Sequence, residues 1–485
     1  MTQSERILVL GASGFVGSHL VPELLQRGWR VRAAARDKSV LAPRDWSCEI
    51  QSVDVLKPET LKPALQDISV VYYLIHGMTE GAGFDEREAL GARNLADAAA
   101  QAGVRRIIYL GALHPEGADS THLRSRTATG EILRRSGIPV TELGAPVIIG
   151  PGSAAFEVMR DLVNHLPVMI TPKWVRSKMA PIALPDLLAD LVELLDHPET
   201  AGQQYKVCGP EVLSYEAQIR ILARQLGRRI RILPVPLLSP GLSARWLRWI
   251  TSVPTGIAKA LVGGLKQDLL ADDRPLRRIL PRDLMSFEEA LRWALSQERS
   301  QVAAATPPLA SLLRRRWQPK FGFYAKKDGA TAHLAAPPDR VWQEICRIGG
   351  VPRYFALDPL WRIREGFDRL IGGPGMNYYR RDPDQLRLGD RVDSWSVAEL
   401  EPERKLTLFF GMKAPGMGGI TFDLDPTKSG GTQLRLTCWW YPAGAWGLIY
   451  WWLLLPAHLI LFRRMVANIG QLAGESGHRP PLTQS

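Results

Sequence analysis

The sequence predicts an α/β fold with a doubly wound parallel sheet, followed by an α+β domain with an antiparallel sheet and a long C-terminal helix. Three observations carry this prediction. The apolar run Ile7–Leu10 stops at Gly11, and a helical pattern begins at Phe15. Strand and helix patterns then alternate through the first third of the chain, which is typical of parallel sheets. Beyond about residue 320 the strands are rich in Thr, Trp and Phe, with the glycine and proline punctuation of an antiparallel meander.

The composition is that of a globular protein that is too long for one core. The chain has 485 residues, of which 46% are hydrophobic and 23% are charged, and chains of this length divide into two or three domains. Its 61 basic and 49 acidic residues give a net charge of +12, which suits an anionic partner such as a phosphorylated cofactor or an acidic membrane surface. No nucleic-acid motif accompanies the charge, so we expect no nucleic-acid partner.

The cysteines are few and far apart, and none forms a paired metal-ligand spacing. They are expected to be reduced thiols rather than zinc ligands or disulfides: Cys48, Cys208, Cys346 and Cys438. The first strand begins at about Arg6, which leaves no room for a signal peptide. We therefore expect a cytoplasmic protein without a metal.

The first domain is expected to span residues 1–300. Five further strands follow the first one, at residues 31–36, 48–55, 70–75, 106–111 and 140–143. Helical spacing separates them at residues 86–102 and 124–136, and short strands with helices between them lead to a helical extension that ends near Arg299. The alternation predicts that all six strands lie in one parallel sheet.

A shift in composition marks the boundary between the domains. Residues 301–319 combine an Ala-rich turn, Pro307-Pro308 and the basic Arg314–Arg316, which is typical of a linker. The second domain then covers residues 320–485. It is expected to open with a strand and a helix at 337–348, to continue with four strands, and to close with the apolar helix 445–462.

The glycine turn gives the most specific functional signal. Three glycines between a strand and a helix let backbone amides approach a pyrophosphate and let the helix pack closely on the strand; the alternative is a glycine-rich turn of another α/β unit. The segment resembles the fingerprint of the atypical and extended short-chain dehydrogenases, which implies a Rossmann fold over residues 1–300. The resemblance assigns cofactor contacts to its seven residues: Gly11, Ala12, Ser13, Gly14, Phe15, Val16 and Gly17.

The resemblance also implies which cofactor is bound. In this family the residue at the end of the second strand reads the adenosine ribose, and an arginine there pairs with the 2′-phosphate of NADP. Arg36 occupies that place, so NADP is expected; a plain surface role for Arg36 is the alternative. Asp37 follows it and keeps NAD possible. The remaining cofactor contacts are expected at the carboxyl ends of later strands: Asp54, Val55, Leu74, Ile75 and Gly111.

The usual catalytic pair of the family is absent. On the helix at His122–Glu131, Leu123 replaces the expected tyrosine and Thr127 the expected lysine, if Glu131 aligns with the glutamate common in that helix. The histidines near the cofactor edge are the candidate substitutes, because imidazole titrates near neutrality, although each is equally explained as an ordinary loop or capping residue: His76, His114 and His122. We expect Arg124 and Arg126 to solvate this helix rather than to bind an acidic substrate.

The second domain resembles the helix-grip fold of the START and polyketide-cyclase superfamily (SRPBCC), and more closely an uncharacterised domain fused to such dehydrogenases in bacteria. The resemblance implies a curved sheet around a long helix and often an enclosed apolar ligand. The helix 445–462 is apolar on every side and precedes Arg463-Arg464, so it must lie in a core or in lipid. We expect the gripped helix of the fold; a membrane span and peripheral membrane contact are the alternatives.

Three functions are compatible with these features. The first is an NADP-dependent oxidoreductase that acts on a small or apolar carbonyl, alkene or quinone-like substrate. The second is a non-catalytic NADP-binding redox sensor or assembly factor, because the tyrosine and lysine are missing. The third is a lipid or quinone binder at the inner face of the membrane. The sequence identifies neither the substrate nor the oligomeric state.

Overall fold

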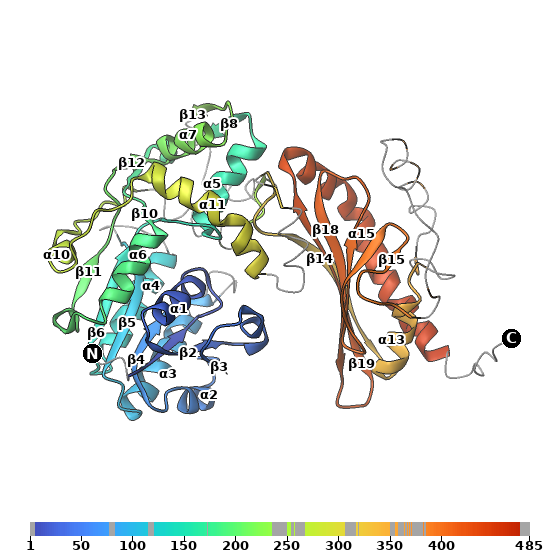
Figure 1. The fold of residues 1–485 in the computed structure, drawn as a ribbon, viewed down its shortest axis with the longest axis horizontal. Coiled ribbons are helices and arrows are strands. Elements are labelled where there is room, and N and C mark those ends of the chain that lie inside the picture. Colours follow the sequence, from blue (N-terminus) through green and yellow to red (C-terminus); the bar gives the residue numbers. More distant parts are fainter. Residues whose placement is uncertain are drawn as a thin grey trace. The chain divides into compact units, whose positions relative to one another are not determined.

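The computed structural model divides the chain into two compact units, residues 1–307 and 308–485 (Figure 1). It describes residues 5–76, 83–114, 121–171, 173–234, 250–253, 257, 267–305, 317–318, 320–349, 355–356 and 385–475, together with the isolated positions 363, 366, 368, 370 and 382. The two units are described separately below.

The first unit is built on a seven-stranded sheet in which every pair of neighbours is parallel. The strand order is β11-β6-β5-β4-β1-β2-β3. The order reverses between β1 and β4, which is the point where open α/β sheets bind ligands. The bounds are β1 (Arg6–Leu10), β2 (Arg30–Ala35), β3 (Glu49–Ser52), β4 (Ile68–Tyr73), β5 (Arg106–Ala112), β6 (Val140–Ala145) and β11 (Gln204–Lys206).

Helices cover both faces of this sheet because successive strand side chains point to opposite faces. In β1, Ile7 and Val9 join one buried cluster, and Leu8 and Leu10 join another. The first cluster packs against α1 (Phe15–Gln26) and α6 (Leu184–Glu193). The second packs against α2 (Pro58–Ala64), α3 (Phe84–Gln101) and α4 (Thr121–Arg134). The predicted doubly wound sheet is therefore confirmed.

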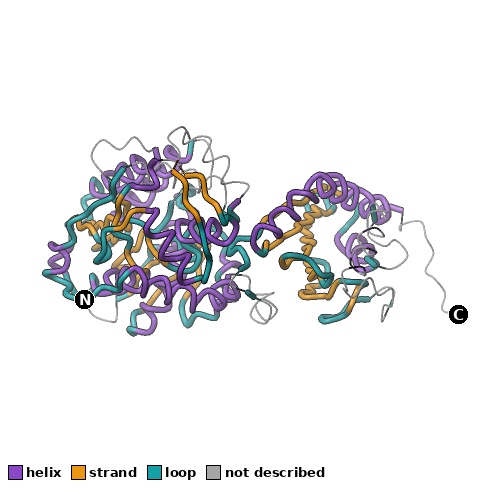
Figure 2. Tube along the Cα trace, turned by 90° about the horizontal axis from the view of Figure 1, so that it is seen from above, coloured by secondary structure: helices purple, strands orange, loops and turns teal. Residues whose placement is uncertain are grey.

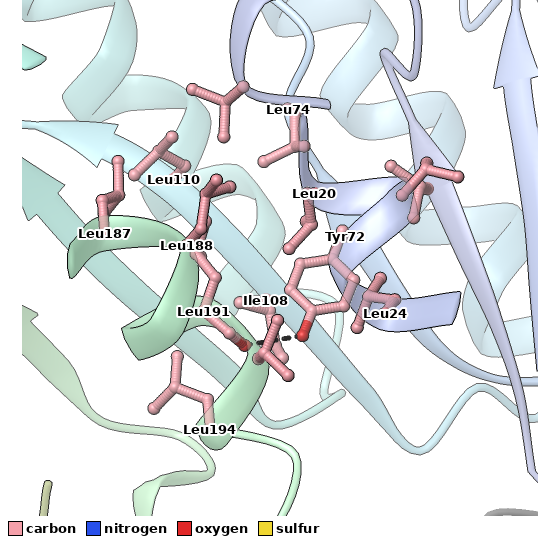
Figure 3. Packing of buried hydrophobic residues seen from close by; sticks show 14 of the residues in the cluster. Leu20, Leu24, Tyr72, Leu74, Ile108, Leu110, Leu187, Leu188, Leu191 and Leu194 are labelled. Carbon is pink, nitrogen blue, oxygen red and sulfur yellow. Dashed lines mark hydrogen bonds between the residues drawn. The ribbon is translucent and has the colours of Figure 1, made fainter. Parts of the chain in front are cut away.

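The first cluster contains a buried hydroxyl group, which needs a hydrogen-bond partner. Tyr72 is fully buried, and its hydroxyl donates a hydrogen bond of 2.7 Å to the carbonyl of Leu191 on α6 (Figure 3). Leucine side chains from α1, α6 and the strands surround the ring. The bond satisfies a hydroxyl that would be costly to bury alone, and it holds α6 against β4.

The rest of the first unit consists of short strand pairs and helices. Their bounds are η1 (Lys38–Val40), η2 (Ala42–Arg44), β7 (Ile148–Ile149), α5 (Ala154–His165), β8 (Val168–Thr171), η3 (Lys173–Arg176), β9 (Lys178–Met179), β10 (Ile182–Ala183), η4 (Pro198–Thr200), β12 (Leu213–Ser214), α7 (Tyr215–Gln225), β13 (Arg231–Pro234), α10 (Arg274–Arg277) and α11 (Phe287–Ala305). Helix α11 continues through Ala305, five residues into the predicted linker, because Val302 and the alanines after it are compatible with a helix.

The second unit is a six-stranded antiparallel sheet with helices packed on it (Figure 2). The strand order is β14-β19-β18-β17-β16-β15. Helix α15 packs on β14, β19 and α13, and its second half contributes Phe462, Met465 and Ile469 to the core. The antiparallel sheet and the long C-terminal helix are as predicted. The bounds are β14 (Lys326–Leu334), α13 (Pro338–Cys346), β15 (Arg391–Val392), β16 (Trp395–Glu401), β17 (Lys405–Phe410), β18 (Gly416–Pro426), β19 (Thr432–Pro442) and α15 (Gly444–Glu475).

Candidate functional site

The glycine turn after β1 has the geometry that its sequence predicts. Gly11 has a φ of +87°, and a Cβ there would lie 3.2 Å from the backbone carbonyl of Leu74. A Cβ on Gly17 would lie 2.3 Å from the Gly11 oxygen, which is impossible without a shift. The amide of Gly14 donates to the carbonyl of Gly11 at 2.9 Å. Only glycine therefore allows the turn to close against both β4 and the first turn of α1.

The turn fits the pyrophosphate of a dinucleotide. Helix α1 begins directly after Gly14, and no side chain caps its first turn. Uncapped amides at a helix N-terminus carry a partial positive charge and bind anions. The cradle formed by Gly11, Gly14 and Gly17 leaves room for such an anion to approach the backbone. The described residues thus fit the group that the sequence predicts.

A cleft of about 220 Å³ opens beside this turn. It lies at the carboxyl ends of β1, β2 and β4, across the point where the strand order reverses. Nine of the predicted site residues line it: Gly11, Ser13, Gly14, Arg36, Asp54, Val55, Leu74, Ile75 and His76. Segments that are 65 residues apart in sequence therefore meet in one place, as the predicted binding mode requires.

The other predicted residues do not line this cleft. Ala12 is buried under the turn, and Phe15, Val16 and Gly17 form the first turn of α1. Gly111 lies inside β5, one residue before its end, where it faces the Glu142 side chain on β6. Gly111 is therefore among the last residues of β5, as predicted, but its contact with a cofactor stays a prediction.

Arg36 and Asp37 follow β2, and they are the two residues considered for the ribose contact. The structure gives them different environments. Arg36 is exposed at the edge of the cleft. The Asp37 carboxylate instead accepts a hydrogen bond of 2.9 Å from the Ser39 amide and caps η1. The bonds from Ser39 lower the pKa of Asp37. Asp37 is thus committed to its own turn, which leaves Arg36 as the charged group of β2 at the cleft.

Arg126 is the main correction to the sequence prediction. It is only 6% exposed and does not solvate α4. Its guanidinium donates to the carbonyl of Ile75 at 2.9 Å and to the carbonyl of Leu110, and it lies 4.8 Å from the centre of the Tyr109 ring. Arg126 therefore ties the ends of β4 and β5 together beneath the cleft, whereas Arg124 is exposed as predicted.

Two of the three candidate histidines lie near this arginine. The protein around the rings and the Arg126 charge lower the pKa of His76 and of His122, the latter to about 4. His76 nevertheless keeps more than a third of its surface open to solvent. Desolvation therefore lowers its pKa less than full burial would. Both imidazoles are neutral at pH 7. His114 is exposed beyond β5 and does not line the cleft.

Glu88 also belongs to the ionisable side chains near Arg126, and it was not predicted from the sequence. It is 7% exposed, lines the cleft and accepts a hydrogen bond from the Ser125 hydroxyl. Tyr73 and Arg87 also line the cleft without having been predicted. The sequence contained a signal for Glu88 and for Arg126. Glu88 falls on the apolar stripe of α3, and Arg126 falls on that of α4 with Leu123 and Leu133.

The residues that replace the usual catalytic pair are structural. Leu123 is buried, and the Thr127 hydroxyl donates to the Leu123 carbonyl at 3.2 Å. Neither supplies an acid or base to the cleft.

A larger cavity of about 730 Å³ lies elsewhere in the first unit. Its charged wall residues include Arg277 and Arg282, which both form ion pairs with Asp190; Arg282 also pairs with Glu193. Neither the glycine turn nor the histidine group borders it. We therefore place the functional site at the smaller cleft, which is lined by the glycine turn and by ionisable side chains.

The sheet order, the glycine turn and the cleft define a dinucleotide-binding α/β protein. The NAD(P)H-binding family matches residues 11–145, and a family of unknown function, DUF2867, matches residues 324–465. These matches identify an NAD(P)-binding Rossmann domain in the first unit, similar to the atypical short-chain dehydrogenases, and a DUF2867 domain in the second. The predicted nicotinamide dinucleotide is confirmed by this family match.

Named relatives share the first unit. Ceramide reductase from Caulobacter vibrioides is 26% identical over 52% of this chain and 82% of its own length. The photosystem II assembly factor Ycf39 from Synechocystis is 23% identical over 59% of this chain and 90% of its own length. Triphenylmethane reductase from Citrobacter sp. has a similar fold, with a TM-score of 0.50 and 18% identity over 60% of this chain and 99% of its own.

Proposed function

We propose that this protein is an NADP-dependent oxidoreductase that reduces a small or apolar carbonyl, alkene or quinone-like substrate. The observation that carries the proposal is that a dinucleotide cleft and a group of ionisable side chains share one wall: His76 and Glu88 line the same cleft as Gly11 and Arg36. Cofactor and proton chemistry are thus available within one site. The relative named ceramide reductase supports an apolar substrate.

Two facts support NADP over NAD. Arg36 is at the cleft, and its planar guanidinium matches the geometry of a phosphate. Asp37, the residue that would accept the ribose hydroxyls of NAD, caps Ser39 instead. An NAD-specific site would use a carboxylate at the end of this strand.

The proposed reaction uses this chain's residues to orient the substrate. The glycine turn and Arg36 would hold NADPH, which would supply the hydride for the substrate carbon. The neutral His76 imidazole donates an N–H to the substrate oxygen, and a neutral imidazole is an effective donor to a carbonyl. Because solvent reaches His76, water replaces the proton that the oxygen takes up. The Arg126 charge helps to keep the His76 ring neutral, and Arg126 also fixes the backbone before His76 by binding the carbonyl of Ile75.

A second candidate function is a non-catalytic NADP-binding redox sensor or assembly factor. Leu123 and Thr127 stand where the usual catalytic pair would be, and both have structural roles. The relative named as a photosystem II assembly factor supports this candidate.

Cofactor turnover separates the two candidates. NADPH affinity is measured by the fluorescence of the bound cofactor, and NADPH oxidation is followed with a panel of ketones, aldehydes, enones and quinones. The oxidoreductase proposal expects turnover with at least one substrate, and a loss of at least about tenfold in kcat for His76→Ala with NADPH affinity retained. His114→Ala is the matched control and keeps its activity. Tight NADPH binding without turnover across the panel favours the sensor.

A further inference from the structure

Helix α15 changes its exposed surface along its length. Its buried face packs on the sheet from Leu448 to Ala473. The opposite face is exposed throughout, and its second half is polar, with Arg463, Arg464 and Asn468. The first half is different, because its exposed positions are apolar: Trp446, Ile449, Leu453, Leu459 and Ile460. We call these five residues the α15 stripe.

The α15 stripe is unusual for the surface of a soluble domain. Trp446 is 74% exposed and Leu453 is 75% exposed. The spacing of the stripe follows the helical repeat, so its members form one continuous band about 21 Å long. A contiguous exposed apolar band marks an interaction site, whereas scattered apolar residues need no explanation. This half of α15 therefore requires a cover.

The helix is not buried in its own domain to the extent predicted from the sequence. Its length and mean hydropathy of 1.6 are compatible with a membrane span, and only 28% of its most apolar stretch is buried. Yet Leu461, Phe462 and Met465 are core residues of the second unit. A helix anchored to a sheet by one face and apolar on the other suits the plane of a membrane interface rather than its interior.

The charges around the α15 stripe indicate which kind of partner binds it. Residues 444–474 contain no Asp or Glu, and Arg463 and Arg464 follow the stripe on the same exposed face. On the neighbouring strand β14, the Lys326 ammonium lies 5.3 Å from the centre of the Trp452 ring. Cations beside an apolar band, with an exposed Trp at its start, are typical of peptides that bind anionic lipid surfaces.

We propose that the α15 stripe docks the second unit on an anionic membrane surface. Trp446 and Leu453 enter the boundary between headgroups and acyl chains, and Arg463 and Arg464 contact lipid phosphates. The protein would then act at the inner face of the membrane, where such lipids are found. This proposal rests on the second unit alone and holds whether or not the first unit turns over NADPH.

Flotation with lipid vesicles tests the proposal on the full-length protein. Vesicles are made from phosphatidylcholine alone or with about 30% phosphatidylglycerol. We expect the protein to float with the anionic vesicles and to be released in part by 0.5 M salt, which screens surface charges. Leu453→Glu is expected to lower the bound fraction at least about tenfold, and the double variant Arg463→Glu, Arg464→Glu is expected to lose the preference for anionic lipid.

Leu90→Glu is the matched control, because Leu90 is an exposed leucine on another helix, α3. It should bind vesicles as the wild type does. Circular dichroism and NADPH affinity report that each variant is folded. The proposal is overturned if the wild type stays in solution with anionic vesicles. It is also overturned if light scattering finds a dimer that Leu453→Glu dissociates, because the stripe then covers a second copy of itself.

Discussion

The Arg126 guanidinium donates a hydrogen bond of 2.9 Å to the carbonyl oxygen of Ile75, 51 residues earlier in the chain. Ile75 lines the dinucleotide cleft, and Arg126 also binds the carbonyl of Leu110 at the end of the adjacent strand. One buried cation thus fixes two strand ends beside the cleft. Structure and cofactor binding should therefore depend on it together.

Arg126→Met is expected to lower the free energy of unfolding by about 1–3 kcal/mol, because it leaves buried carbonyls without a donor. It should also weaken NADPH binding, since the backbone at Ile75 is no longer held. Chemical denaturation and NADPH titration measure the two effects. Arg124→Met, at an exposed position on the same helix, is the control. Equal losses in both variants would contradict the role given to Arg126.

Gly17→Ala is expected to weaken NADPH binding at least about tenfold and to destabilise the first unit by about 1–3 kcal/mol. The new Cβ would lie 2.3 Å from the Gly11 carbonyl oxygen and 2.9 Å from the Ala12 Cα, so α1 must move away from the turn. Isothermal calorimetry and thermal unfolding report the two changes. Gly474→Ala meets no atom within 4 Å and should leave both unchanged. Wild-type affinity in Gly17→Ala would show that the turn does not hold the cofactor.

The glycine turn was predictable because its information is local. Strand, turn and helix are contiguous, and Gly14 and Gly17 are required by the backbone of Gly11 and Ala12 a few residues away, although Gly11 itself faces Leu74. Positions such as Asp54 and Ile75 could be placed at the cleft because parallel strands all end at the same edge. The general arrangement of both domains followed from the change between alternating α/β segments and consecutive strands.

The electrostatics of the site were not predictable in the same way. The role of Arg126 depends on carbonyls 16 and 51 residues away, and arginines on helices are usually exposed. Helical periodicity places Arg126 on the buried stripe with Leu123, but periodicity does not show which carbonyls its guanidinium binds. Likewise, only the burial pattern of α15 reveals that one half of its apolar surface is exposed, because its composition is apolar on every side.

Arg36→Asp is expected to weaken NADPH binding by at least about tenfold while changing NADH binding much less, since a lost phosphate pairing affects only NADP(H). Dissociation constants for both cofactors, measured at the same salt concentration, check the prediction. Lys38→Asp introduces the same charge change two residues away, at an exposed position on η1. If both cofactors lose affinity equally in Arg36→Asp, the assignment of Arg36 to the 2′-phosphate is wrong.

His122 should make the stability of the first unit depend on pH. Burial, followed by the Arg126 charge, lowers its pKa to about 4 from an ordinary value of 6.5. Between these values the unfolded chain binds a proton that the folded chain does not, so stability falls as the pH drops from about 6.5 to about 4. His122→Gln should reduce this fall, whereas His114→Gln, at an exposed position, should not. Denaturation midpoints at pH 7.5, 6, 5 and 4 measure the difference, and parallel curves for His122→Gln and the wild type would refute it.

Arg160 on α5 joins two carboxylates in the interior of the first unit. It is fully buried, it pairs with Glu157 at 2.7 Å, and it pairs with Glu298 on α11. The second oxygen of Glu157 accepts from the Gly152 amide at 2.9 Å, so the group also holds the loop before α5. Burial raises the pKa of Glu157, and Arg160 opposes the shift. The Arg160 charge therefore favours the ionised form of the Glu157 carboxyl against the effect of burial.

Arg160→Met should therefore lower the free energy of unfolding by about 3–5 kcal/mol at pH 7.5, because two buried carboxylates lose their cation. The deficit should shrink toward pH 5, where both carboxyls can take up protons and become neutral. The triple variant Arg160→Met, Glu157→Gln, Glu298→Gln removes all three charges and should recover part of the loss. A triple variant no more stable than Arg160→Met, with a deficit that does not vary with pH, would assign the effect to packing rather than to charge.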